Sequence, residues 1–439
     1  MNFALFLQPL HSQQTVDRAM TENLSMTSDP RKKGKGRALV SSTVILLALA
    51  GFLTVTVWLN IWVVSEQQFG LLAQSFLHGE LAFRTMPGLS WGDTSPHNGH
   101  YYWPLGPFPA VVLVPFELVA AKFHTFFYQG YLQPLFVLAV LVIVYRIARV
   151  TGYGVEDAAY LGFGFGFATA FLGVAMWPWS WFFSQVITCL LVFAAIAEMI
   201  TRRRPWVLGV LFALVLATRV TSALGVFWCV AVILSARDPW RKKLGSLVAI
   251  ALPILAVAAL LMVYNYVRFD NPFDSGYAEQ LLVIPRLAET RALGVFSLRH
   301  IPGNLYFLLL AAPLPVFRNS SLALTFPYVV ADGWGMNLWI TSPCLLYLLG
   351  LRQRDGTSRL LLLTSLLILV PILLYYGVGG PHQFGYRYLL DFLPFLYYLL
   401  LRNYRQQRGD LTAGFKAVLL GSAVWNLYLF TGHFVWRVG

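Results

Sequence analysis

The stretch from Ser65 to Pro107 holds the residues best suited to chemistry. It is the longest polar interruption between the first two apolar segments of the chain. Among its residues are Glu66 and Asp93, the histidines His97 and His100, and a run of aromatics, Tyr101, Tyr102 and Trp103. Carboxylates and imidazoles are the groups that most often transfer protons in active sites. We therefore expect this loop to carry the chemistry and the remaining chain to hold it in place.

Asp93, His97 and His100 also invite a metal-binding interpretation. Their spacing of i, i+4 and i+7 would align three ligands only on a helix, whereas the sequence WGDTSPHNGHYY has the glycine and proline of an irregular loop. The three cysteines of the chain lie inside apolar segments, which supports neither a thiolate metal site nor a disulfide framework. We predict no metal site.

The composition is that of an integral membrane protein. Hydrophobic residues make up 58% and charged residues 12% of the chain, with a mean hydropathy of +0.64, whereas a soluble domain carries about 25% charge. The apolar segments are about 15 to 25 residues long, which suits helices crossing ~30 Å of hydrocarbon and not the strands of a barrel. The predicted fold is an all-α polytopic membrane protein with about 11 to 12 transmembrane helices and a long first extracytoplasmic loop.

The net charge of +13 comes from short basic clusters between the apolar segments. These clusters span residues 31–37, 146–149, 202–204, 237–243, 352–359 and 402–408. Such a pattern places the clusters on the cytoplasmic side and argues against a nucleic-acid partner. Residues 1–37 are then a disordered cytoplasmic tail. Residues 38–439 form a single membrane domain with extracytoplasmic loops 64–104 and 267–334.

Prolines and glycines mark two irregular places in this pattern. The chain must return to the cytoplasm by Arg146, so only one of the apolar runs 104–122 and 130–149 crosses fully. Four prolines interrupt the first run, which we predict to be re-entrant or interfacial. The glycines of GFGFGF, residues 162–167, lie in an apolar span, and close helix packing explains them better than nucleotide binding.

The orientation brings most polar residues near span ends to one side of the membrane. That side receives Glu66, Asp93, Gln185, Arg219, Asn265, Arg268, Asp274, His382 and Arg387. Ionisable groups at span ends cost free energy unless they are paired or hydrated, so their collection on one face predicts a site. Any one of them could equally be an ordinary loop charge, or an arginine snorkelling to the interface.

Four sequence landmarks resemble one enzyme family. SEQQFGLLAQSFLHGEL with NGHYYWPLGPFPAVVLVP, then LATRVTSAL, YNYVRFDNPFDSGY and GGPHQFGYRYLLDFLPF, follow each other in the order seen in GT-C glycosyltransferases. The chain is similar to the bacterial protein mannosyltransferase-like and lipid A sugar transferase-like members, from residue 40 to about 400. The resemblance implies sugar transfer from a polyprenyl-phosphate donor in the bacterial inner membrane, with the N-terminus cytoplasmic and the active site extracytoplasmic.

The resemblance also implies roles for individual residues. Glu66 matches the general base after the first span, although members more often carry aspartate there. Asp93 would orient substrate or assist the base, unless it only starts a turn with Ser95 and Pro96. The leaving lipid phosphate would be met by arginine, for which we choose Arg268, Arg387 and Arg219. Candidate substrate-binding residues are Gln67, His97, Tyr101, Trp103, Gln185, Asn265, Asp274, His382 and Tyr388, and Asn265 shares a helix face with Arg268.

Two other functions remain open at this stage. A transporter or flippase would move lipid-linked sugars without breaking a bond, although transporters usually place polar residues near the bilayer midplane. An inactive binding scaffold would also fit the glutamate at 66. Sequence signatures of nucleotide binding or of Ser or Cys nucleophiles are absent, so the expected substrates are a lipid-linked sugar donor and a glycan, lipid or protein acceptor. No cofactor is expected, and the sugar and acceptor are not specified by the sequence.

Overall fold

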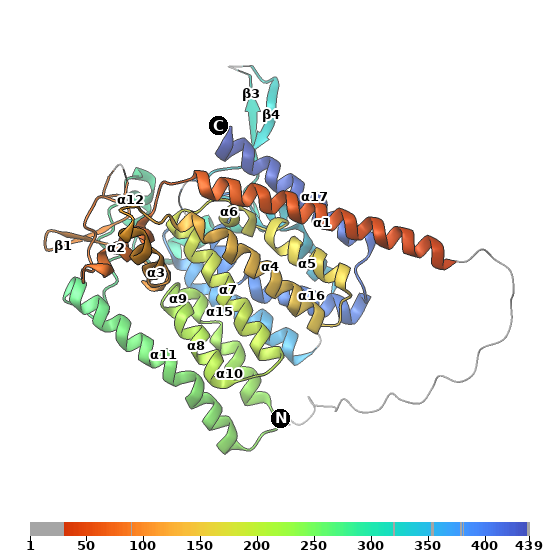
Figure 1. The fold of residues 1–439 in the computed structure, drawn as a ribbon, viewed down its shortest axis with the longest axis horizontal. Helices are drawn as coiled ribbons and strands as arrows, with labels where there is room; N and C mark the ends of the chain where they lie inside the picture. The colour runs from red at the N-terminus through yellow and green to blue at the C-terminus, as the bar shows by residue number, and fades with distance from the viewer. Residues whose placement is uncertain are drawn as a thin grey trace.

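The computed structural model is a bundle of helices with two small β-hairpins (Figure 1). It describes residues 30–88, 90–318, 321–352, 355–377, 380 and 382–436, with only the backbone for 30–40. The predicted tail up to residue 29 lies outside these residues, and the first helix already begins at Pro30. The helical bundle confirms the predicted all-α polytopic fold class.

Six segments of the described chain are long and apolar enough to cross a membrane. They lie in α1 (Pro30–Trp62), α4 (Gln133–Val150), α7 (Ser180–Ile200), α11 (Trp240–Phe269), α15 (Gly356–Leu374) and α17 (Ala413–Phe430). Shorter helices complete the bundle: α5 (Val155–Phe167), α6 (Phe171–Met176), α8 (Pro205–Leu216), α9 (Val220–Ala223), α10 (Val226–Ser235), α13 (Ile301–Leu309), α14 (Leu338–Thr341) and α16 (Leu393–Arg408). Some apolar stretches therefore form two short consecutive helices, as α5 with α6 and α9 with α10 do.

The helix directions separate two ends of the bundle. At one end, which we call the cavity end, α1 and α11 finish and α7 and α16 begin. At the other, the basic end, α7 finishes beside Arg202–Arg204 and α16 finishes with Arg405 and Arg408. These two basic clusters therefore lie at the end of the bundle opposite the cavity end.

The glycines of residues 162–167 bring α5 close to its neighbours. A Cβ atom on Gly162 would lie 2.9 Å from the carbonyl oxygen of Leu141 in α4, and one on Gly166 would lie 2.4 Å from the Leu141 side chain. A Cβ on Gly164 would approach Leu419 of α17 at 2.7 Å. Close packing is therefore the reason for these glycines, as expected.

The loop after α1 contains more regular structure than the sequence suggests. Helix α2 (Gln68–Leu77) follows directly, and a hairpin of β1 (Ser95–His97) and β2 (His100–Tyr102) precedes α3 (Phe108–Lys122). Helix α3 packs on α2 and is not among the six candidate spans. Figure 1 shows both helices beside the bundle at the cavity end.

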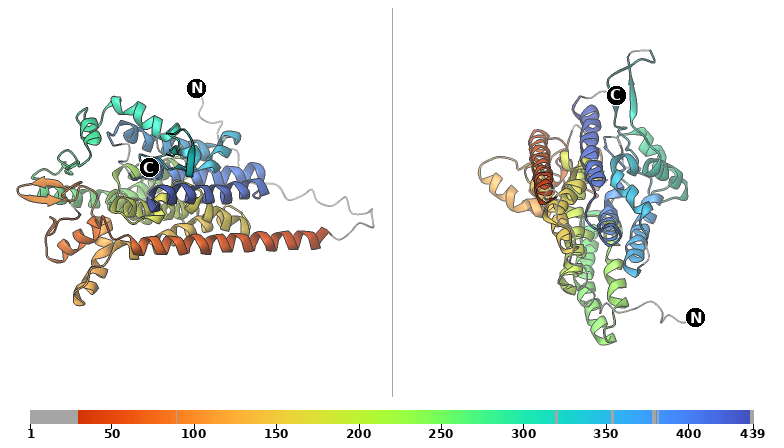
Figure 2. Two further views of the ribbon diagram at one scale, coloured as in Figure 1. Left: turned by 90° about the horizontal axis from the view of Figure 1, so that it is seen from above. Right: turned by 90° about the vertical axis from the view of Figure 1, so that its right-hand side faces the viewer.

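The second long connection, between α11 and α14, also lies at the cavity end. It contains α12 (Pro285–Arg291), then α13, and then a second hairpin of β3 (Leu314–Phe317) and β4 (Leu324–Val330). The views in Figure 2 show that this second hairpin projects from the body of the molecule.

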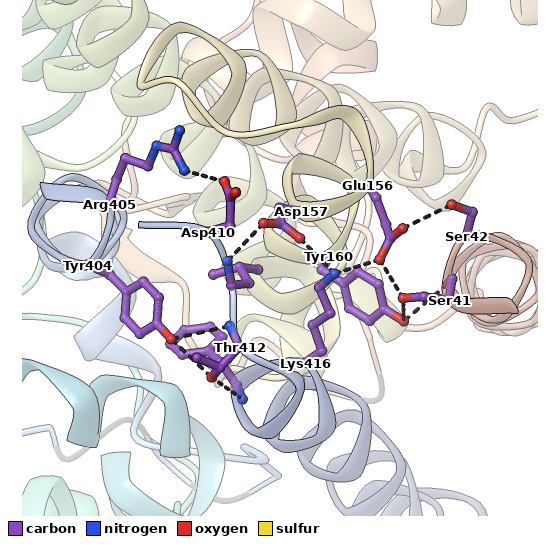
Figure 3. Close-up of polar contacts among 12 residues, drawn as sticks. Ser41, Ser42, Glu156, Asp157, Tyr160, Tyr404, Arg405, Asp410, Thr412 and Lys416 are labelled. Atoms are coloured by element: carbon purple, nitrogen blue, oxygen red, sulfur yellow. Dashed lines mark hydrogen bonds and ion pairs between the residues drawn. The ribbon is translucent and has the colours of Figure 1, made fainter. Parts of the chain in front are cut away.

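A charged network at the basic end joins three helices (Figure 3). The Nζ atom of Lys416 in α17 lies 2.5 Å from Oε1 of Glu156 and 2.7 Å from Oδ1 of Asp157, both in the first turn of α5. Glu156 also accepts hydrogen bonds from Ser41 and Ser42 of α1. One lysine therefore neutralises two carboxylates that sit where α1, α5 and α17 meet.

We predict that Lys416→Met destabilises the fold. The substitution leaves two carboxylates of low exposure without their cation, a change that costs roughly 2 to 3 kcal/mol. The melting temperature of the purified protein in detergent should fall by several degrees, and Lys122→Met, at an exposed end of α3, serves as the control. Adding Glu156→Gln and Asp157→Asn should recover part of the loss. Equal melting temperatures for Lys416→Met and the original protein would contradict the assignment.

Candidate active site

A cavity of about 790 Å³ opens at the cavity end of the bundle. Its wall comes from the loop after α1, the start of α7, the turn between α8 and α9, and the ends of α11 and α15. The connection 275–296 and the segment 380–391 complete it. Its volume is within the range usual for small-molecule sites. Much of the wall is apolar, and the polar groups described below converge on it.

The cavity collects many of the side chains singled out from the sequence. Those lining it are Glu66, Asp93, Arg219, Asn265, Arg268, His382, Arg387 and Tyr388. They come from segments that are far apart in the chain, so their meeting is a property of the fold and not of any local motif.

Glu66 is held rigidly between α1 and α2. Its backbone carbonyl accepts hydrogen bonds from Ser180 Oγ at 2.9 Å and Gln129 Nε2 at 3.2 Å. Its side-chain Oε2 accepts one from Gln68 Nε2 at 2.5 Å. Burial raises the pKa of the Glu66 carboxyl, and the Gln68 hydrogen bond opposes this. The carboxyl group is thus fixed in position and more basic than an exposed glutamate.

Asp93 lies close enough to Glu66 for their charges to interact. Burial raises the pKa of Asp93 to about 6, and the negative charge of Glu66 adds to the rise, while Arg387 and a hydrogen bond from Gln280 oppose it. Gln280 Nε2 donates to Oδ1 at 3.0 Å. Two carboxyl groups with raised pKa values thus line one cavity, a feature that is common where proteins transfer protons.

Three of the polar cavity residues occupy left-handed backbone conformations. The φ angles are 57° at Glu66, 61° at Asp93 and 68° at His382. Non-glycine residues seldom adopt this region, and for a glutamate the conformation is strained. Strain of this kind is most often retained at functional sites, where the backbone aims a side chain in a particular direction.

Arg219 forms a buried ion pair with Asp391. Its Nε lies 2.7 Å from Oδ1 and its Nη2 3.1 Å from Oδ2, in a bidentate arrangement. Thr221 also donates a hydrogen bond to the Asp391 carboxylate. Asp391 was not anticipated from the sequence, where only its position in the apolar run LLDFLPF marks it. Since Asp391 neutralises Arg219, this arginine is less suited to binding a phosphate than expected.

Arg268 lines the cavity but is engaged by the protein. Its guanidinium donates to the Trp103 carbonyl and to Asn265 Oδ1, each at 2.7 Å, and to the Tyr264 carbonyl at 3.3 Å. It also stacks on the Tyr264 ring, 3.8 Å from the centroid. The shared helix face of Asn265 and Arg268 is confirmed. Arg268 fastens the first loop to the end of α11.

Arg387 begins the 3-10 helix Arg387–Asp391 and lies over the Tyr388 ring, 4.8 Å from its centroid. Its backbone carbonyl accepts a hydrogen bond from Gln185 Nε2 at 2.8 Å. Its charge lowers the pKa of Asp93. The ring of His382 lies 5.7 Å from that of Trp179, and burial lowers the pKa of His382. Arg387 therefore lines the same cavity as the two carboxyl groups, and its charge acts on Asp93.

Six of the predicted site residues do not line the cavity. They are Gln67, His97, Tyr101, Trp103, Gln185 and Asp274, and each has another structural use. Gln67 accepts from the backbone of Gln129 and Gln185 donates to that of Arg387. His97 contacts Asp270, 3.0 Å away on an exposed surface.

The aromatic and acidic members of this group are explained in the same way. Tyr101 stacks on Trp91 with ring centroids 4.1 Å apart, and Trp103 is buried against Phe69. Asp274 accepts a hydrogen bond from the backbone of Gly276, which is the turn role common for aspartate. Within the described residues, no group of three or more His, Cys, Asp or Glu is placed to hold a metal ion.

Comparison with known proteins gives a distant similarity. No family model matches the chain, and no curated protein sequence matches it. Two solved structures resemble it. Both are of the Archaeoglobus fulgidus oligosaccharyltransferase, one in the apo form and one tethered with an acceptor peptide containing the NVT sequon via a disulfide bond.

The apo form has a TM-score of 0.45 and 14% sequence identity, over 88% of this chain and 55% of that one. The tethered form has a TM-score of 0.41 and 12% identity, over 88% and 54%. The chain thus spans about half the length of the oligosaccharyltransferase. These values are too low to transfer the role of any residue.

The raised pKa of Asp93 predicts a pH-dependent stability. Well below pH 4 the carboxyl is protonated in both the folded and the unfolded protein. Well above pH 6 it is ionised in both, and burying the charge in the folded protein then costs about 3 kcal/mol. Stability should therefore fall as pH rises through this window. Asp93→Asn removes the titration, so its melting temperature relative to the original protein should increase between pH 4.5 and 7.5. Parallel curves for the two proteins would contradict the prediction.

Proposed function

We propose that the protein is a GT-C-type glycosyltransferase, which moves a sugar from a polyprenyl-phosphate donor to an acceptor at the extracytoplasmic face. The observation that carries this proposal is the meeting of Glu66, Asp93 and Arg387 in a cavity whose wall is otherwise largely apolar. The order of the sequence landmarks supports the same assignment. The distribution of the basic clusters along the chain supports placing the cavity outside the cytoplasm and the N-terminus inside.

Glu66 would act as the general base. Its carboxylate would take the proton of the acceptor hydroxyl as that oxygen forms a bond to the anomeric carbon of the sugar. The bond between the anomeric carbon and the phosphate oxygen would break, and its electron pair would leave with the lipid phosphate. Direct displacement of this kind inverts the anomeric configuration. Asp93, beside the base, would orient the acceptor or a sugar hydroxyl.

Arg387 would stabilise the leaving phosphate. A guanidinium offers fixed, forked donors that match phosphate oxygens, and its effect is strong in a cavity with little water. Arg387 lines the same cavity as Asp93. Arg219 would act indirectly. It forms an ion pair with Asp391, the last residue of the 3-10 helix that begins with Arg387, and would thereby hold that helix in place.

The apolar wall fits the lipid part of the donor. Leu261 of α11, Leu216 of α8, and Pro371 and Ile372 of α15 line the cavity. Helices α11 and α15 are both candidate membrane spans. A prenyl chain could therefore lie along these helices while its phosphate meets the charged groups. The proposed donor is thus anchored in the same bilayer as the protein.

Replacing Glu66 with glutamine should abolish sugar transfer without unfolding the protein. Loss of a general base typically lowers the rate by about 100-fold to 10,000-fold. The assay follows labelled sugar from a polyprenyl-phosphate hexose or pentose in membranes that contain the acceptor. Glu80→Gln, on an exposed glutamate of the same loop, is the matched control. Full activity in Glu66→Gln would remove the residue from the mechanism, and unchanged donor appearing in the opposite leaflet would favour a flippase.

Arg387→Met should weaken both binding and reaction of the lipid donor. Losing a charge-assisted hydrogen bond to phosphate costs about 1.5 to 3 kcal/mol, so kcat/KM should fall by roughly 10-fold to 100-fold. Arg299→Met, an exposed arginine in the same connection as α12, should leave kcat/KM unchanged. If Arg387→Met keeps the original kcat/KM, the donor phosphate is bound elsewhere.

A further inference from the structure

The β3–β4 hairpin is an exposed apolar element that the cavity does not use. In Figure 1 and in the right-hand view of Figure 2 it stands out from the helical body, beside the C-terminal end of α17. Strand β3 pairs with β4 in antiparallel register, from Leu314 opposite Val330 to Phe317 opposite Leu324. In the described part of the chain this sheet has two strands, so both outer edges are unpaired.

Several large apolar side chains of the hairpin are exposed. Leu322 is 88% exposed, Phe326 63% and Leu324 51%, and Phe317 and Tyr328 are also exposed. An isolated two-stranded hairpin is at best marginally stable in water, and clustered exposed apolar groups of this kind mark an interaction surface. A hydrophobic environment is therefore needed to cover the hairpin.

The base of the hairpin is attached to a membrane span. The ring of Phe326 lies 5.2 Å from that of Trp436, and the Tyr428 hydroxyl donates to the carbonyl of Pro327. Tyr428 lies in α17, within the candidate span Ala413–Val435. Trp425, which stacks on Tyr428, and Trp436 are both partly exposed. The apolar surface of the hairpin thus continues from the lipid-facing surface of α17.

The chemistry of the hairpin specifies its depth in the membrane. Unpaired strand edges cannot lie in the hydrocarbon core, because no group there can satisfy their backbone N–H and C=O groups. Arg318, exposed at the end of β3, would be costly there too. Tryptophan and tyrosine beside the end of a span are typical of the membrane–water interface, where water and headgroups can bond to the backbone.

We propose that the β3–β4 hairpin inserts into the headgroup and upper acyl-chain layer of the leaflet at the cavity end. Leu322, Leu324 and Phe326 enter the top of the acyl chains, and Arg318 meets lipid phosphates. The hairpin is an interfacial anchor separate from the spans, and it lies beside the cavity without lining it. The proposal does not depend on the reaction assigned to the cavity.

Fluorescence quenching in lipid vesicles tests this placement. An environment-sensitive probe is attached to Leu322→Cys and, in a second variant, to Phe326→Cys; the three native cysteines are buried. The control is Glu289→Cys, on the exposed surface of α12. In vesicles of phosphatidylglycerol and phosphatidylcholine, both hairpin probes should be quenched more by nitroxides at the top of the acyl chain than by nitroxides at its middle. They should also be shielded from iodide. The control probe should be quenched by iodide and not by the lipid nitroxides.

Three results would overturn the proposal. Hairpin probes that iodide quenches and lipid nitroxides do not would show that the hairpin stays in water. Probe shielding that appears only at high protein density would show that a second copy covers the hairpin, especially if unlabelled Leu322→Cys copies form a disulfide with each other when an oxidant is added. Leu322→Asp in the Phe326→Cys background gives an independent check, because this exposed position is not needed for folding. The Phe326→Cys probe should then become accessible to iodide, and unchanged shielding would also contradict insertion.

Discussion

The buried ion pair of Arg219 with Asp391 is the interaction on which the cavity depends. It connects the turn between α8 and α9 to the short helix that begins with Arg387, across 172 positions of sequence. Both side chains are largely removed from solvent. Neither charge would be tolerable there alone, so each segment requires the other to be in place. The position of Arg387 and Tyr388 in the cavity follows from this constraint.

The cavity has a polar part, which contains the carboxyl groups, and an apolar part. On the polar side, Glu66 and Asp93 lie near each other, and both carboxyl groups have raised pKa values because burial disfavours their charged forms. On the other side the wall is formed by side chains of membrane spans. The helices that contribute to the wall reach it at the cavity end of the bundle.

Much of this arrangement could be predicted from the sequence because charged residues are rare in it. Glu66, Arg268 and Arg387 stand out at the ends of apolar segments, and the basic clusters assign those ends to one side. Other features depend on contacts that no local pattern contains. The pairing of Arg219 with Asp391 joins distant segments, and the left-handed backbone of Glu66 is unusual for glutamate.

Dependence on such distant contacts also explains why some residues that were expected at the cavity lie elsewhere. His97 lies in a hairpin whose pairing turns it towards Asp270, and Asp274 is occupied by its own turn. The apolar stretch 155–176 forms two helices, α5 and α6, and between them the Thr169 hydroxyl donates a hydrogen bond to the Phe165 carbonyl. Side-chain direction and helix breaks of this kind are decided by tertiary contacts, so residue type alone does not reveal them.

Helix α11 separates the cavity from the surrounding lipid by a single layer. Leu261, Tyr264 and Arg268 line the cavity, whereas Leu260, Val263 and Val267 on the same helix are exposed and apolar. A lipid-linked molecule that enters beside this helix is supplied by the bilayer and not by water. Its effective concentration is then its mole fraction among the membrane lipids. Occupancy of the cavity would vary with dilution by other lipids or by detergent, even when the amount of ligand per volume stays constant.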